Sequence, residues 1–226
     1  MIGDVPDLAQ VRSCGVCFYV LRDGDGLYLI DTGFIGAASR LEKVLASRGW
    51  ETLPIRGILL THGHLDHVLN AARFARRNGA WIAGPEGDRE RFAGRHQPHG
   101  AKRLVDRMEG AGRRLLDYEP FCVDRLVRDD ETFDLWHGLR AIHLPGHTEG
   151  HTGYLCEKFG LLFCGDLFAS YGPFSHRPPR CFNEDSPEAE RSIRRALGVD
   201  LHGVLPHHCD HAPAAKHLQR LRRLAG

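Results

Sequence analysis

Short apolar runs separated by turn residues dominate the first third of the chain, which is typical of a sheet-forming segment. A hairpin is indicated at Arg22-Asp-Gly-Asp-Gly26, because these turn residues separate two apolar runs. Apolar positions three or four residues apart, followed by a glycine, indicate helices. The strands predicted in this way span residues 16–21, 27–30, 55–61 and 81–83, and the helices span residues 36–49 and 68–78.

The middle of the chain has a different pattern, since residues 85–120 are highly charged and their apolar positions are only weakly periodic. We expect one or two exposed helices there, laid over the fold as a helical cover insertion at about residues 85–130. Apolar runs then return. They predict strands at residues 132–135, 139–143, 152–156, 161–164 and 204–205, and helices at residues 187–197 (with Ser186 as N-cap) and 214–224.

Two strand-rich halves, each closed by helices, predict a layered architecture. Sheets and amphipathic helices both need to bury an apolar face, and two sheets packed face to face with helices outside meet that need. The predicted fold class is therefore α/β (α+β), as a four-layer αββα sandwich. A chain of 226 residues fits one large domain, so we expect a single domain over residues 1–226.

Composition and charge narrow the choice of partner. The 30 basic and 29 acidic residues leave a formal net charge of +1, which gives no electrostatic reason to expect nucleic acid or an anionic membrane. There is no leader-like N-terminal segment and no run of ~18 apolar residues. The seven cysteines are an odd number, and a chain of this length does not need disulfide bonds to be stable. We therefore expect free thiols, no membrane span and a cytoplasmic location.

The 15 histidines matter more, because several of them cluster in Thr61-His-Gly-His-Leu-Asp-His67, after an apolar strand and at the start of a helix. His62 and His64 are two residues apart, so on an extended chain both can point to one side and share a metal ion. Asp66 and His67 are adjacent, so their side chains diverge and suit a second ion beside the first. Imidazole and carboxylate together suit zinc, and also iron or manganese.

This His-x-His-x-Asp-His pattern resembles the signature of the metallo-β-lactamase superfamily. Other segments resemble further motifs of that family, in the family's order, and the set lies within residues 27–208. They are Asp31-Thr-Gly33, Leu144-Pro-Gly-His147, Phe163-Cys-Gly-Asp166 and Leu205-Pro-His-His208. The fold of the family is an αββα sandwich, which agrees with the independent order of predicted strands and helices.

Carried over residue by residue, the resemblance implies two metal ions that share one carboxylate. The first ion would take His62, His64 and His147, the second would take Asp66, His67 and His208, and Asp166 would bridge them. Asp66 and Asp166 are also the expected catalytic residues, with Asp66 orienting or relaying a proton. The last ligand is open, because the family usually has Gly-His where this chain has His207 and His208. Alignment on the proline favours His208, with His207 and then His211 as alternatives.

Two further residues are expected to support the ligands. Asp31 would hold the histidine-rich loop by hydrogen bonds, with a simple turn aspartate as the alternative. His151, four residues after His147, would orient the site without binding metal.

The substrate pocket is expected to use aromatic residues. Phe168, Tyr171 and Phe174 follow the bridging aspartate and are the candidate pocket residues. Phe92, Tyr118 and Phe121 of the cover are also aromatic, but their packing on the core is the favoured interpretation.

The implied activity is hydrolysis of a small ester, lactone or thioester by a metal-bound hydroxide. Two ions roughly 3.5–4 Å apart can share a water and lower its pKa toward ~7. The expected cofactors are two divalent ions, with zinc favoured and iron or manganese as alternatives. The expected partner is a small-molecule substrate, and the oligomeric state stays open, with a homodimer as one option.

Other activities of the family remain as alternatives. Glyoxalase-type thioesterases are disfavoured, because residues 209–226 are too few for the helical C-terminal domain with which such enzymes hold glutathione. An oxidoreductase similar to the persulfide dioxygenases would use a single iron. A non-catalytic metal-binding member of the fold would keep the ligands without hydrolysing a substrate.

Overall fold

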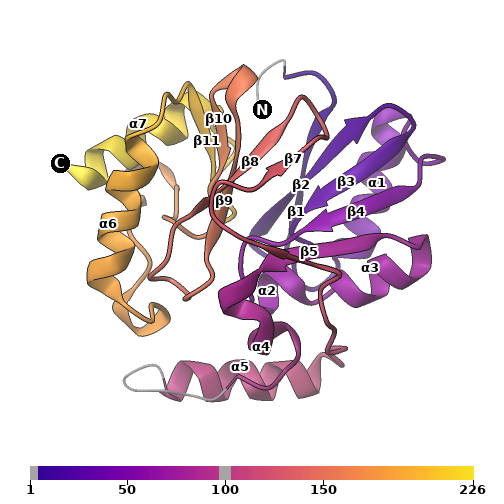
Figure 1. The fold of residues 1–226 in the computed structure, drawn as a ribbon, viewed down its shortest axis with the longest axis horizontal. Helices are drawn as coiled ribbons and strands as arrows, with labels where there is room; N and C mark the ends of the chain where they lie inside the picture. The colour runs from indigo at the N-terminus through magenta and orange to yellow at the C-terminus, as the bar shows by residue number, and fades with distance from the viewer. Residues whose placement is uncertain (1–4, 97–102) are drawn as a thin grey trace.

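The structure, a computed structural model, describes residues 5–96 and 103–226 (Figure 1). The strands are β1 (Leu8–Ser13), β2 (Val16–Asp23), β3 (Gly26–Ile30), β4 (Ile55–Leu59), β5 (Trp81–Pro85), β6 (Arg125–Val127), β7 (Thr132–Phe133), β8 (Leu139–His143), β9 (Thr152–Cys156), β10 (Leu161–Phe163) and β11 (Gly203–Leu205). The helices are α1 (Ala37–Arg48), α2 (Leu65–Val68), α3 (Ala71–Asn78), α4 (Arg89–Phe92), α5 (Arg103–Leu115), α6 (Ser186–Leu197) and α7 (Ala214–Ala225). None of the described helices is long and apolar enough to cross a membrane.

Two mixed β-sheets face one another in the centre of the molecule (Figure 1). The first has the strand order β1-β2-β3-β4-β5-β6, antiparallel from β1 to β3 and parallel from β3 to β6. The second has the order β11-β10-β9-β8-β7, in which only β10 and β11 run parallel. Helices α1 and α3 cover the outer face of the first sheet, and α6 and α7 cover that of the second. The predicted αββα sandwich is confirmed.

Three apolar clusters fill the spaces between these four layers. Tyr19, Tyr154 and Phe163 belong to the cluster between the two sheets, and the other two clusters lie under the helices. Strand β2 shows how the sequence builds this arrangement. Its alternate residues Cys17, Tyr19 and Leu21 enter the cluster between the sheets, whereas Phe18 and Val20 pack beneath the helices of the first sheet. A strand buried on both faces therefore reads as a continuous apolar run.

The predicted strands and helices are present, with a few differences at their ends. Strand β1 was not predicted, because its sequence Leu-Ala-Gln-Val-Arg-Ser mixes polar and apolar residues, as suits the edge of a sheet. The helix expected at residues 68–78 begins only at Ala71, as α3, and a break at Leu69 and Asn70 separates it from the preceding short helix α2. The side-chain amide of Asn70 donates hydrogen bonds to the carbonyls of Thr32, Gly33 and Phe34, which ties this break to the turn after β3.

The cover segment is helical only in part. Helices α4 and α5 lie within it, and α5 runs along one side of the sandwich (Figure 1), while β6 joins the first sheet beside β5. Residues 97–102 fall outside the described residues. Phe92 is fully buried and its ring stacks on Phe121 at 5.6 Å, and Tyr118 packs on the same core. These aromatic residues therefore pack on the core, as favoured from the sequence.

The N-cap of α6 differs from the predicted Ser186. The carboxylate of Asp185 accepts a hydrogen bond of 2.8 Å from the backbone N–H of Glu188, and Ser186 is the first helical residue. Asp185→Ala is expected to lower the free energy of unfolding by about 0.5–2 kcal/mol, because a helix N–H loses its acceptor. Asp185→Asn, which keeps a capping oxygen, should stay close to wild type. Urea unfolding of the three proteins measures this, and equal stability of Asp185→Ala and Asp185→Asn would contradict it.

Candidate metal centre

The predicted ligands come from the ends of strands in both sheets. The histidine-rich segment follows β4, and His147 lies in the loop between β8 and β9. Asp166 and His208 follow the parallel strands β10 and β11. Because the carboxyl ends of parallel strands meet at one edge of a sheet, the fold brings these distant segments together.

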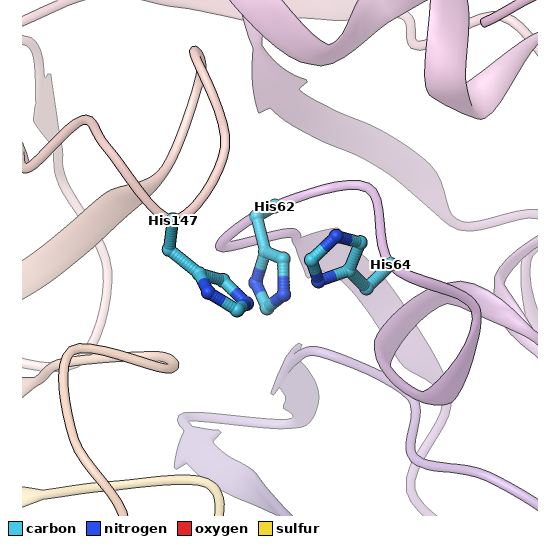
Figure 2. Close-up of side chains that lie close together, drawn as sticks. All are labelled: His62, His64 and His147. Atoms are coloured by element: carbon cyan, nitrogen blue, oxygen red, sulfur yellow. The ribbon is translucent and has the colours of Figure 1, made fainter. Parts of the chain in front are cut away.

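One group of ligands consists of His62, His64 and His147, whose rings face one another (Figure 2). One ring nitrogen from each lies within 4.8 Å of the others. The ring centroids of His62 and His147 are 5.0 Å apart, and those of His64 and His147 are 4.6 Å apart. All three are buried. This is the set expected to hold the first ion.

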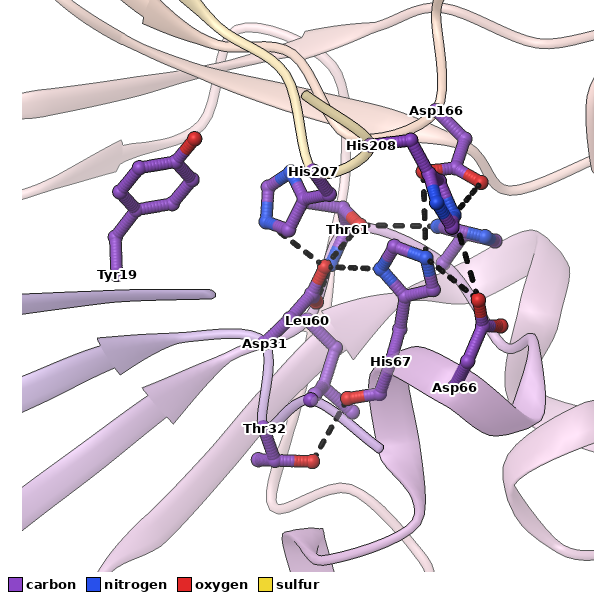
Figure 3. A network of polar contacts seen from close by, with 12 residues as sticks. Tyr19, Asp31, Thr32, Leu60, Thr61, Asp66, His67, Asp166, His207 and His208 are labelled. Carbon is purple, nitrogen blue, oxygen red and sulfur yellow. Dashed lines mark hydrogen bonds and ion pairs between the residues drawn. The ribbon is translucent and has the colours of Figure 1, made fainter. Parts of the chain in front are cut away.

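A second group consists of Asp66, His67 and His208, with Asp66 and His208 half-buried beside the fully buried His67 (Figure 3). The Nε2 atom of His208 is 3.3 Å from Oδ2 of Asp66, and Nε2 of His67 is 3.8 Å from the same atom. This is the set expected to hold the second ion.

Asp166 lies between the two groups. Its Oδ1 is 3.3 Å from Nε2 of His67, and its Oδ2 is 3.2 Å from Nε2 of His208 and 3.5 Å from Nε2 of His147. One carboxylate thus contacts a histidine of the first group and two of the second. This is the position that a bridging ligand requires.

The Nδ1 atoms of three histidines are bonded to protein acceptors, which leaves each Nε2 directed at the cluster. Nδ1 of His62 is 3.0 Å from the hydroxyl of Thr61, Nδ1 of His67 is 2.8 Å from Asp31, and Nδ1 of His147 is 3.0 Å from Oδ1 of Asn183. Such bonds fix the tautomer and the ring orientation of a metal-binding histidine. The chain therefore presents the nitrogen lone pairs that a cation needs.

Asp31 holds the histidine-rich loop, as expected (Figure 3). Its carboxylate accepts hydrogen bonds from the backbone N–H and the hydroxyl of Thr61, at 2.7 and 2.6 Å, besides the bond from His67. Its backbone has φ +60°, a left-handed conformation that aspartate tolerates better than most residues. The alternative of a simple turn aspartate does not fit a fully buried carboxylate with these partners.

A second buried aspartate, Asp88, joins the two loops of the first group. Its carboxylate accepts a 2.6 Å bond from the N–H of Gly63, between His62 and His64. It also accepts bonds from the hydroxyl of Thr148 at 2.8 Å and the N–H of Gly150 at 2.9 Å. Asp88 is fully buried. Sequence analysis missed it, because its partners are distant along the chain and no local pattern marks it.

His151 supports Asp166 and does not face the cluster with a lone pair. Its Nδ1–H donates to the carbonyl of Leu144 at 2.9 Å, and its Nε2 accepts a 3.0 Å bond from the backbone N–H of Asp166. Burial lowers the pKa of His151 to about 3, with a further contribution from His147, so the ring stays neutral and can accept. The structure gives it the supporting position expected from the sequence.

The two alternatives to His208 occupy different places. His207 is fully buried, with Nε2 3.1 Å from the Asp31 carboxylate and its ring packed edge-on against Tyr19. His211 lies on the surface, 3.5 Å from a guanidinium nitrogen of Arg12. Of the three histidines, His208 is the one that faces both Asp66 and Asp166.

The electrostatics of the cluster favour added positive charge. Burial opposes the ionised form of Asp166, but His208 and His67 outweigh it and hold the pKa of this carboxyl well below its ordinary value. Burial likewise opposes the charged form of His208, but Asp166 and Asp66 raise its pKa to about 10. Buried charges need compensation, and divalent cations can supply it here.

The residues also fit a metal ion by their donor chemistry. Among the described residues, the buried Nε2 of His62 has no hydrogen-bond partner, although it points into the cluster (Figure 2). A buried nitrogen without a protein partner is costly unless a bound ion or water satisfies it. Imidazole nitrogens and carboxylate oxygens are the ligands preferred by zinc, and iron and manganese also accept them.

A cavity of about 660 Å³ opens onto the cluster and is lined by Asp66, His64, His147, Asp166 and His208. Phe168 and Tyr171 line it, as expected, and so does His176. Phe174 does not line it and is 79% exposed. It follows Pro173 in a short 3-10 turn at Gly172–Phe174, which directs the ring to solvent. Two further aromatic residues line the cavity, Phe34 from the turn after β3 and Phe182 from a later loop, and neither was predicted from the sequence.

The fold and this cluster define a class of proteins with two sheets between helices and a histidine–aspartate metal centre at the strand ends. A sequence model described as the Metallo-beta-lactamase superfamily matches residues 13–224, so the chain belongs to this family. The resemblance noted in the motifs is confirmed.

Curated relatives carry the names of hydrolases. A hydroxyacylglutathione hydrolase of Methylococcus capsulatus is 28% identical over 182 residues, a match that covers 78% of this chain but only 58% of that protein. Another, from Haemophilus influenzae, is 29% identical, with 69% of this chain and 68% of that protein covered. An atrochrysone carboxyl ACP thioesterase of Aspergillus fumigatus is 26% identical over 92% of this chain and 54% of that protein. These relatives support a metallo-hydrolase.

Solved structures show the same fold. A metallo-beta-lactamase family protein from Thermus thermophilus superposes with a TM-score of 0.76 at 23% identity, covering 98% of this chain and 79% of that one. A subclass B3 metallo-beta-lactamase of Bradyrhizobium japonicum gives a TM-score of 0.69 at 20% identity, covering 97% and 88%.

The choice between His207 and His208 as ligand can be tested by metal content. His208→Ala is expected to lose one metal ion per chain. His207→Ala should keep its metal ions but lower the free energy of unfolding by about 1–3 kcal/mol, since it removes a buried partner of the Asp31 carboxylate. Elemental analysis and urea unfolding of both variants measure this. Loss of metal from His207→Ala alone would assign the ligand to His207.

Asp88 is expected to control metal binding without touching the metal. In Asp88→Asn, one acceptor oxygen becomes an amide that faces donor groups, so the loops of His62, His64 and His147 lose a common bond. Metal affinity should fall about 10–100-fold, as for other residues that orient ligands. Competition with a chromogenic chelator measures it, with the exposed Asp200→Asn as control. Wild-type affinity in Asp88→Asn would refute this role.

Proposed function

We propose that this protein is a metal-dependent hydrolase of small thioesters, esters or lactones, with thioesters as the first choice. The observation that carries the proposal is the pair of ligand groups that share the Asp166 carboxylate and open onto one cavity. The relatives' names, hydroxyacylglutathione hydrolase and ACP thioesterase, support the thioester class. The expectation that disfavours glyoxalase-type thioesterases stays a prediction within this class.

In the proposed site, His62, His64 and His147 would hold one divalent ion, Asp66, His67 and His208 would hold the other, and Asp166 would bridge them. When bound, the two ions supply Lewis acidity and lower the pKa of a coordinated water toward ~7. In the overall reaction, water adds its oxygen to the acyl carbon and the C–S or C–O bond breaks. The products are a carboxylate, the free thiol or alcohol, and a proton.

The protein's own residues would provide orientation and proton handling. Asp66 is the half-exposed carboxylate of the second group and lines the cavity, so it can orient a water or take up its proton at a carboxylate oxygen. Burial opposes its ionised form, but His67 and His208 lower its pKa, which keeps Asp66 available as an acceptor. Asp31, Asp88 and His151 would hold the ligands in place and thus limit the reorganisation that the reaction needs.

The proposal predicts two divalent ions per chain and hydrolysis that depends on them. Elemental analysis of freshly purified protein should find close to two zinc or manganese ions. Dialysis against a chelator should abolish hydrolysis of a thioester, ester and lactone panel, and zinc or manganese should restore it. Asp166→Asn, as the matched variant, should bind fewer ions and lose activity by at least about 100-fold.

Two other outcomes would replace the proposal. About one iron per chain, with oxygen consumption and no hydrolysis, would indicate a mononuclear iron oxygenase. Two bound ions without hydrolysis of any substrate in the panel would indicate a non-catalytic member of the fold.

A further inference from the structure

The cavity beside the cluster is lined by apolar residues as well as by the candidate ligands, and these apolar residues form a wall. Val105 and Met108 of α5 lie on that wall, together with Phe34, Phe168, Pro179 and Phe182. At about 660 Å³, the cavity lies within the range of pockets that enclose a small organic molecule. The wall is therefore suited to the part of a substrate that does not react.

Charge limits what this wall can bind. Among the described residues, no lysine or arginine lines the cavity, whereas Asp66, Asp166 and Glu109 do. The charge of Glu109 is already paired, because its Oε1 lies 2.7 Å from the guanidinium of Arg113 and also accepts the N–H of Leu65. An anionic substituent would thus enter a cavity in which no described lysine or arginine can pair with it.

The adjoining cavity does not supply an excess of positive charge either. It has a volume of about 910 Å³ and shares Pro178 and Pro179 with the first. Its Arg91 and Arg177 are paired with the carboxylates of Glu184 and Glu190. Asp106 and Asp185 line the same space. Arg180 lines it as well, but the four acidic residues Asp106, Glu184, Asp185 and Glu190 outnumber the three arginines.

Some of the apolar residues that line the first cavity are exposed to solvent. Met108 is 67% exposed and Phe182 is 44% exposed, although both line the cavity. Covering such surface is favourable by about 25 cal/mol per Å². Exposed apolar groups that are joined to a pocket mark a binding surface more often than isolated ones do.

From these observations we propose that the acyl group of the substrate is an apolar chain of medium length, which packs between α5 and the Phe168–Phe182 wall. The rest of the substrate carries little negative charge. This inference rests on the proposed hydrolytic function and narrows its substrate class. It also separates this chain from relatives named for hydroxyacylglutathione, whose acyl group is polar and whose leaving thiol carries carboxylates.

The first test compares acyl chains on one neutral thiol. Acetyl, butyryl, hexanoyl and octanoyl thioesters of N-acetylcysteamine are hydrolysed by metal-loaded protein, with S-lactoylglutathione as the anionic comparison. The value of kcat/KM should rise by up to about fourfold per methylene, the gain from burying a methylene fully, and S-lactoylglutathione should be the poorest substrate. A flat or falling series, or a preference for S-lactoylglutathione, would overturn the inference while leaving the hydrolytic function intact.

The second test places a charge on the wall. Met108→Glu should lower the ratio of octanoyl to acetyl kcat/KM at least about tenfold, and the ratio cancels any general loss of activity. Met108→Leu should keep the ratio. Leu115→Glu is the matched control, because Leu115 lies on the same helix, is 84% exposed and does not line the cavity. An equal fall in Leu115→Glu, or none in Met108→Glu, would contradict the assignment of this wall.

A binding measurement separates failure of the inference from failure of the proposed function. Calorimetry compares the non-hydrolysable S-octyl and S-ethyl thioethers of N-acetylcysteamine, with wild type and Met108→Glu. Tighter binding of the S-octyl compound by wild type, reduced in Met108→Glu, supports the apolar site even in a protein that hydrolyses no thioester. Equal binding of the two compounds rejects the apolar site whatever the catalytic result.

Discussion

The carboxylate of Asp31 is the interaction on which the rest of the site depends. It lies fully buried at the end of β3, where it accepts hydrogen bonds from Thr61 and His67. A buried carboxylate is stable only when its oxygens are satisfied, and here the groups that satisfy it belong to the histidine-rich segment. The hydrogen bonds that stabilise the buried Asp31 carboxylate therefore also fix the position of the candidate ligands. The same bond directs Nε2 of His67 toward Asp66 and Asp166.

Asp88 is a second buried carboxylate whose hydrogen bonds hold the site, here by joining the histidine-rich segment to the loop of His147. Asp31 connects the histidine-rich segment to the first sheet, whereas Asp88 connects it to the loop of His147, which belongs to the second sheet. Burial raises the pKa of Asp88, although Arg91 and its hydrogen bonds oppose the rise. The segment from Thr61 to His67 is therefore held from both sheets at once. The relative position of the two ligand groups follows from how the sheets pack.

The sequence predicted the layers and pointed to candidate ligands that the fold brings together, because both leave local patterns. Apolar runs of strand length report burial, and His-x-His-x-Asp-His places its donors within one loop. Asp88 and Asn183 leave no such pattern, since their bonds reach Thr148 and His147 across the fold. The break at Asn70 depends in the same way on carbonyls of the β3 turn. Phe174 was misplaced because distance from Asp166 along the chain does not tell which way a turn directs a ring.

Helix α5 is hydrogen-bonded to the backbone on both sides of His64, so the cavity wall and the candidate ligands are directly connected. Helix α5 carries two apolar residues of the cavity wall, Val105 and Met108, and Glu109 of that helix accepts the N–H of Leu65. Arg113, also on α5, donates to the carbonyl of Gly63, which lies between His62 and His64. A shift of α5 toward a bound acyl chain would therefore move the backbone on either side of His64. Substitutions in the cover can change the turnover of a substrate as well as its affinity, because the wall and the ligands are joined by these two bonds.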